Sequence, residues 1–130
     1  EPELLQYGPG FVLYLSGDLG DDVLRQVGQT VRGAVRSSDM VCRWGGEEFI
    51  VIAPNTNLEE IEIVAEKLRL AVFEALSGCQ PKVTVSVGVA SAPGSAIDLN
   101  GLMSDADAAL YRAKENGRNQ VASTLSASSA

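Results

Sequence analysis

The chain has 130 residues, 45% of them hydrophobic, which suits one compact domain with a core of its own. Its formal net charge of -7 argues against non-specific binding to nucleic acid or to an anionic membrane surface. Because the sequence contains no histidine, mechanisms that use a histidine base or a histidine metal ligand are excluded.

Apolar residues that recur every two, or every three to four, positions predict alternating strands and helices. In chain order we expect a strand, a helix, a β-hairpin, a helix, a strand, a helix and a short strand, over residues 11–15, 20–36, 40–53, 58–78, 83–90, 102–113 and 120–123. Asn55, Thr56 and Asn57 are candidate caps for the second helix, and Asn116 with Gly117 is expected to end the third. This order predicts an α/β fold, an α+β sandwich of the ferredoxin-like kind, with a mostly antiparallel sheet and its helices on one face. We expect a single domain over residues 1–124, with residues 1–10 irregular and 125–130 a disordered tail.

The tip of the predicted hairpin is the most informative stretch, because it holds Gly45, Gly46, Glu47 and Glu48. Adjacent glycines supply the positive φ of tight turns and let backbone N–H groups approach a phosphate. The glutamates offer the oxygen ligands that Mg²⁺ prefers, and Mg²⁺ accompanies nucleoside triphosphates. A surface turn with solvated glutamates is the plainer interpretation of this turn taken alone.

Further motifs accompany the hairpin, and together they resemble the GGDEF domain family of diguanylate cyclases in its GGEEF variant. They lie at residues 20–24, 36–39, 84–88 and 106–119. The resemblance implies a palm-like relative of the ferredoxin-like fold, as in nucleotidyl cyclases. It also implies condensation of two GTP molecules into cyclic di-GMP with release of pyrophosphate, at the interface of two domains and with Mg²⁺ or Mn²⁺ as cofactor.

The resemblance assigns roles to the hairpin. Glu47 resembles the family's metal ligand and proposed base for the attacking ribose 3′-hydroxyl, and Asp18 resembles the other metal ligand. Gly45 and Gly46 would pass the backbone along the phosphates. Glu48 begins a strand, in which neighbouring side chains point to opposite faces, so we expect one of the two glutamates to dominate metal binding.

Three more residues resemble the family's substrate contacts. Asp21 matches the aspartate that reads guanine, although an N-cap at the start of the second element is the structural alternative. Lys114 and Arg118 match the pair that clamps the terminal phosphates. Cations near a helix C-terminus are also favoured by the helix dipole alone.

A second group of residues resembles the family's inhibitory site for cyclic di-GMP. Arg36 and Asp39 form its RxxD motif, and an arginine can bond bidentately to the O6/N7 edge of guanine. Lys67 falls where the family often has a further arginine, which lysine does not replace in stacking or in forked hydrogen bonding.

The chain departs from the family after Asp18, which runs directly into Leu19. The family has there a helix with Phe-Lys, an asparagine that reads guanine and a Gly-His turn. Either these elements are deleted or the printed sequence passes over them. We expect the second, because a parallel crossover needs a connection. A true deletion would leave a domain that binds nucleotide poorly.

Two alternatives therefore stay open: a catalytically impaired domain that senses cyclic di-GMP, and a different nucleotidyl cyclase, which turnover of ATP would favour. For the leading interpretation the partners are GTP, cyclic di-GMP, a second such domain in a homodimer, and a sensory or receiver domain outside this chain. Cys42 and Cys79 are too few for a disulfide framework. Together with the absence of a signal-peptide pattern or long apolar run, they predict a cytoplasmic domain without membrane contact.

Overall fold

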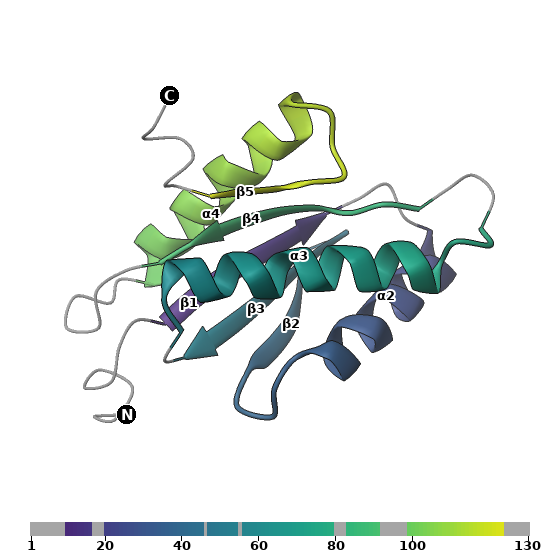
Figure 1. Ribbon diagram of the computed structural model, residues 1–130, viewed down its shortest axis with the longest axis horizontal. Helices are drawn as coiled ribbons and strands as arrows, with labels where there is room; N and C mark the ends of the chain where they lie inside the picture. The colour runs from purple at the N-terminus through teal and green to yellow at the C-terminus, as the bar shows by residue number, and fades with distance from the viewer. Residues whose placement is uncertain are drawn as a thin grey trace.

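The computed structural model describes residues 10–16, 20–45, 47–54, 56–79, 83–91 and 99–123 (Figure 1). The strands are β1 (Gly10–Ser16), β2 (Met40–Gly45), β3 (Glu48–Pro54), β4 (Ser86–Ala90) and β5 (Val121–Ser123). The helices are α2 (Asp21–Ala34), α3 (Leu58–Ala75) and α4 (Leu99–Glu115). This is the order that the sequence predicts. The chain ends and the junction of Asp18 with Leu19 lie outside the described residues, so those predictions stay untested.

The strands form one sheet in the order β2-β3-β1-β4-β5. β1 lies at its centre, antiparallel to β3 and β4, and β2 pairs with β3 as the predicted hairpin. Of the described pairs, that of β4 with β5 is parallel. Because α2 joins β1 to β2 and α3 joins β3 to β4, the connections are those of a ferredoxin-like fold, which confirms the predicted class.

Helices cover both faces of the sheet, so the prediction that they share one face is wrong for α4. α2 and α3 pack with Phe49, Val51 and Val87 in one apolar cluster, whereas α4 packs against Ile50 and Ala90 in another. Figure 1 shows α3 in front of the sheet and α4 on the other side. The reason is that successive residues of β3 and β4 are apolar, which makes both faces of these strands suitable for burial.

The ends of α3 and α2 follow from local chemistry. Asn57 caps α3: its side chain accepts from the Glu60 N–H at 2.8 Å, and the Glu60 carboxylate accepts from the Asn57 N–H at 2.9 Å. This capping box confirms one of the predicted cap residues. α2 begins after Gly20, and its buried stripe recurs at helical spacing through Leu24, Val27 and Val31.

α4 approaches β4 most closely at Gly88. A Cβ atom on Gly88 would lie 2.2 Å from the Ala106 carbonyl oxygen and 2.4 Å from the Leu110 nitrogen. Only glycine fits this contact without moving the helix. Among the helices in the described part of the chain, none is long and apolar enough to cross a membrane.

Candidate functional site

Most of the predicted catalytic and substrate residues come together at one end of the sheet. Ser16, the last residue of β1, pairs with Glu48 on one side and with Ser86 on the other. Neighbouring strands lie about 4.8 Å apart, so the backbones of Glu48 and Ser86 are separated by about 10 Å. The turn after α4 reaches the same end, because the Asn119 N–H donates to the Ser86 Oγ at 3.2 Å.

The hairpin tip carries the two glutamates. Gly45 pairs with Glu48, and the register is irregular between Arg43 and Gly45, so Glu47 lies at the tip. Glu48 begins β3 as predicted, and both glutamates are half-buried. Gly46 lies outside the described residues.

A metal site at this tip remains a prediction. Carboxylate oxygens of Glu47 and Glu48 suit Mg²⁺ or Mn²⁺ by their chemistry. The remaining expected ligand, Asp18, lies outside the described residues. Within the residues that are described, no three acidic, cysteine or histidine side chains gather closely enough to hold a metal ion.

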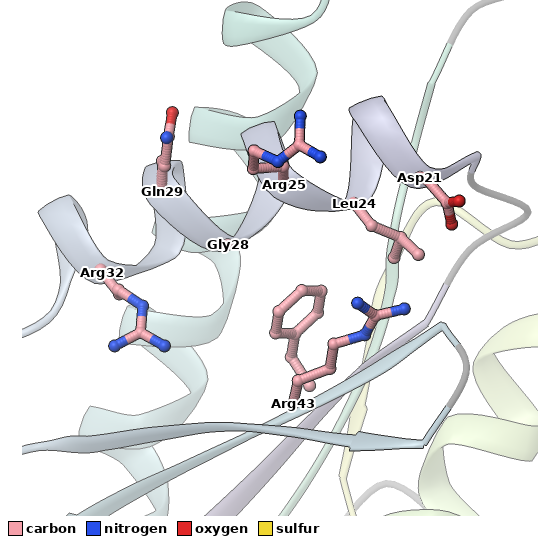
Figure 2. A pocket seen from close by; sticks show the side chains of 8 residues that line it. Asp21, Leu24, Arg25, Gly28, Gln29, Arg32 and Arg43 are labelled. Atoms are coloured by element: carbon pink, nitrogen blue, oxygen red, sulfur yellow. The ribbon is translucent and has the colours of Figure 1, made fainter.

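A pocket of about 490 Å³ lies between α2 and the hairpin and extends along the helix from Asp21 to Arg32 (Figure 2). Its lining consists of Asp21, Leu24, Arg25, Gly28, Gln29, Arg32, Arg43 and Phe49. Figure 2 shows Arg43 extending from its strand toward Leu24, whereas Arg25 and Gln29 point away from the strand. The sequence analysis predicted Asp21 as a substrate contact but did not identify Arg43 as part of the site. The one feature of the sequence that could have pointed to Arg43 is its position just before the glycine turn.

Asp21 does not cap its helix. The N-cap of α2 is Gly20, without a side-chain hydrogen bond, and Asp21 is the first helical residue. The N-cap alternative for Asp21 is therefore wrong. Its exposed carboxylate is left available at the edge of the pocket.

Lys114 and Arg118 flank the end of α4. Lys114 is half-buried in the last turn, and exposed Arg118 follows the helix. Gly117, with φ of 117°, ends the helix as predicted. The Arg118 N–H donates to the Ala113 carbonyl at 2.9 Å and the Gly117 N–H donates to that of Lys114 at 3.4 Å, a Schellman-type end.

The predicted inhibitory residues lie together in a second pocket, of about 300 Å³. It is lined by Arg36, Asp39 and Lys67, with residues of α3 and the segment before it. Arg36 donates from Nη2 to Asp39 Oδ1 at 3.2 Å, and its backbone N–H donates to Oδ2 at 2.9 Å. Nη2 also donates to Thr56 Oγ1 at 2.6 Å. The sequence suggested Thr56 only as a cap candidate; the structure makes it a partner of Arg36.

The two pockets adjoin along α2, since Arg32 lines the first and Ala34 the second, but the predicted site residues lie toward opposite ends of the hairpin. Gly45 pairs with Glu48 at the tip, whereas Met40 pairs with Ile52 at the far end. Arg36 precedes Met40, and it contacts Thr56 just beyond β3. The predicted substrate residues and the predicted inhibitory residues are therefore separated by the length of the hairpin.

Comparisons with known proteins agree on one family. The model of the family described as "Diguanylate cyclase, GGDEF domain" matches residues 17–120. The chain is 41% identical over 102 residues to diguanylate cyclase DgcM of Escherichia coli, covering 78% of this chain and 25% of DgcM. It is 39% identical over 109 residues to the response regulator PleD of Caulobacter vibrioides, covering 80% and 24%. The chain thus spans about a quarter of these relatives.

Solved structures resemble the fold closely. The GGDEF domain of DgcB from Caulobacter crescentus, in complex with c-di-GMP, has a TM-score of 0.81 at 26% identity, over 91% of this chain and 79% of that chain. The active GGEEF domain of a diguanylate cyclase from Vibrio cholerae has a TM-score of 0.77 at 25% identity, over 89% and 83%.

Proposed function

Because the chain belongs to the diguanylate cyclase GGDEF domain family, we propose that it condenses two GTP molecules into cyclic di-GMP and pyrophosphate. The observation that supports this most is the gathering of Asp21, the hairpin glutamates and the Lys114–Arg118 pair around one end of the sheet. This arrangement offers a base-reading carboxylate, a proton acceptor and phosphate-binding cations within reach of one nucleotide.

The substrate is held by residues from three elements. The Asp21 carboxylate accepts hydrogen bonds from the N–H groups of guanine, beside the apolar side chain of Leu24. Gly45 and Gly46 let the phosphates approach the backbone. Lys114 and Arg118 donate to the terminal phosphates, and such charge-assisted bonds are stronger than neutral ones.

Glu47 acts as the base in the proposed reaction. It accepts the proton of the ribose 3′-hydroxyl while that oxygen attacks the α-phosphorus of the second GTP, and pyrophosphate leaves in line. A divalent cation held by Glu47, with Glu48 and Asp18 as further ligands, would neutralise phosphate charge and lower the pKa of the hydroxyl. Two such domains must face each other, because each supplies one nucleotide to the ring.

The second pocket binds the product. Arg36 donates to the O6/N7 edge of a guanine of cyclic di-GMP, and Asp39 and Thr56 hold its guanidinium in place. Lys67 adds charge near the phosphates. Product bound there inhibits the enzyme.

Proximity of the two domains is supplied from outside this chain. A sensory or receiver domain would raise the effective concentration of one domain beside the other and so control the homodimer. The reaction takes place in the cytoplasm.

A second candidate function is a cyclic di-GMP sensor without catalysis. In the pocket around Arg36, hydrogen bonds to Asp39 and Thr56 already orient the guanidinium. By contrast, the connection after Asp18 lacks elements of the family pattern that read guanine.

Product formation distinguishes these functions. The protein, at high concentration with Mg²⁺ and GTP, should form cyclic di-GMP, and Glu47→Gln should abolish this. Glu59→Gln, the same change on an exposed turn of α3, is the matched control and should leave product formation intact. No product from the native chain, with retained cyclic di-GMP binding, would favour the sensor, and equal turnover of ATP would favour a different cyclase.

A further inference from the structure

The turn that carries Arg118 has an unusual backbone. Gly117, Arg118 and Asn119 have φ angles of 117°, 64° and 50°, so all three lie in the positive range. Arg118 and Asn119 are the non-glycine residues of the described chain with this property. Asparagine adopts a left-handed conformation readily, but arginine does so at a cost, so surrounding contacts must hold it.

Two of those contacts are local: the Arg118 N–H donates to the Ala113 carbonyl at 2.9 Å, and Gln120 Nε2 donates to the Arg118 carbonyl at 3.1 Å. Others reach the next residue from α3 and β4. Arg69, on α3, donates from Nη1 to Asn119 Oδ1 at 2.7 Å, across 50 positions of sequence. The Asn119 N–H donates to the hydroxyl of Ser86, which is buried in the first position of β4. Asn119 is therefore fixed from its side chain and from its backbone, directly after Arg118.

Arg69 is itself held by Glu66. Its Nε donates to Glu66 Oε1 at 2.9 Å, and its Nη2 donates to Oε2 in the same forked contact. This hydrogen bonding lowers the pKa of Glu66 and raises that of Arg69, and burial opposes both shifts. Each of the three guanidinium nitrogens of Arg69 thus has an acceptor within the protein.

We propose that Arg69 is a positioning residue for Arg118 and, through it, for the terminal phosphates of GTP. The inference rests on the proposed function. Arg69 does not touch the substrate: oriented by Glu66, it holds Asn119, which keeps the preceding residue in its left-handed conformation. This conformation lets the Arg118 side chain leave the end of α4 at the end of the sheet that carries the hairpin tip.

The test compares a nucleotide that has terminal phosphates with one that does not. The probes are α,β-methylene-GTP, in which the bond that releases pyrophosphate is not cleaved, and GMP, both with Mg²⁺. Arg69→Ala should weaken binding of α,β-methylene-GTP by roughly three- to tenfold, as for a misplaced charge-assisted hydrogen bond. Binding of GMP should change by less than about twofold, because GMP lacks the phosphates that Arg118 contacts.

A double-mutant cycle separates positioning from general structure. In an Arg118→Ala background, Arg69→Ala should have no further effect on α,β-methylene-GTP. Arg112→Ala is the matched control. Like Arg69, Arg112 is half-buried, but its Nη2 donates to the backbone oxygen of Ser123, at 3.1 Å, and not to Asn119. Its removal should lower stability without changing the preference for α,β-methylene-GTP over GMP.

A second variant guards against a misfolded protein. Asn119→Gly keeps the left-handed backbone accessible and removes the acceptor of Arg69, so it should show the same selective loss, with thermal unfolding as the check on folding. Equal weakening of both nucleotides, or an undiminished effect in the Arg118→Ala background, would overturn the positioning role alone. A native protein that binds both nucleotides equally would instead overturn the proposed phosphate contacts, and this inference with them.

Discussion

Two arginine–carboxylate pairs, each spaced three residues apart, have opposite exposures. In the pair of Arg36 with Asp39 the arginine side chain is 53% exposed and the carboxylate 2%. In the pair of Arg69 with Glu66 the arginine is 14% exposed and the carboxylate 47%. The first pair presents a guanidinium to solvent from a buried support, and the second points its guanidinium inward.

The difference shows that the same ion pair can serve a ligand or the protein itself. Arg36 keeps part of its donor set available beside a pocket. Arg69 instead donates from all three guanidinium nitrogens to Glu66 and Asn119. Which of the two an arginine does depends on the partners that the fold brings to it.

The largest expected effect is on product binding. Arg36→Ala should weaken cyclic di-GMP binding by about 1.5–3 kcal/mol, the value of a hydrogen bond that involves a charged group, because it removes the donor that faces the guanine. Titration calorimetry measures this, and relief of product inhibition should accompany it. Arg112→Ala, away from the pocket, is the control. Unchanged affinity would show that Arg36 does not contact cyclic di-GMP.

The next largest effect is on stability, and here Arg69→Ala should have a larger effect than Arg36→Ala. Arg69→Ala should lower the free energy of unfolding by about 1–2 kcal/mol, because it leaves the half-buried Asn119 side chain without its donor. Arg36→Ala should lower it by less than about 1 kcal/mol, since exposed ion pairs contribute little. Chemical denaturation of both variants gives the comparison. Equal losses would remove the distinction between the two pairs.

Thr56 offers a smaller change within the product pocket. Thr56→Val removes the hydroxyl that accepts from Arg36 and donates to the Pro54 carbonyl at 3.0 Å. Cyclic di-GMP binding should fall by about 0.5–1.5 kcal/mol, the value of one hydrogen bond. Thr56→Ser keeps the hydroxyl and should bind as the native protein does. If both variants bind equally well, Thr56 does not support Arg36.

The smallest expected effect is a dependence on pH. Hydrogen bonds from Arg69 lower the pKa of Glu66 from its usual 4.5 in the folded protein. The unfolded chain then binds the proton more readily, so this stabilisation is complete above pH 4.5 and is lost as the pH falls through the lowered pKa. Denaturation across a pH series should show a shallower acid loss for Glu66→Gln. Identical slopes would contradict the coupling of Glu66 to Arg69.

Much of the fold could be predicted because its signals are local. The period of two in β4, the Asn57 cap and the Gly117 stop each act within a few residues. The face covered by α4 could not, since β3 is apolar on both sides. Nothing in the sequence of α4 itself says which side of the sheet it will cover.

The candidate sites divide in the same way. Arg36 and Asp39 lie three positions apart and were predicted as a pair. The contact of Arg36 with Thr56 spans 20 positions and that of Arg69 with Asn119 spans 50. Such partners meet only after the sheet has formed, so sequence motifs mark the groups that contact ligands better than the groups that support them.

The close contact at Gly88 sets the orientation of α4 relative to the sheet. The helix has 17 residues and is about 26 Å long, and it rests on the β4 backbone between Ala106 and Leu110. Lys114 lies about 6 Å beyond Leu110 along the axis of the same helix. A methyl group at residue 88 would push α4 away from β4. A small tilt of the helix at this contact would shift Lys114 and Arg118 at its C-terminal end. The alignment of the proposed phosphate site therefore depends on the absence of a Cβ atom at residue 88.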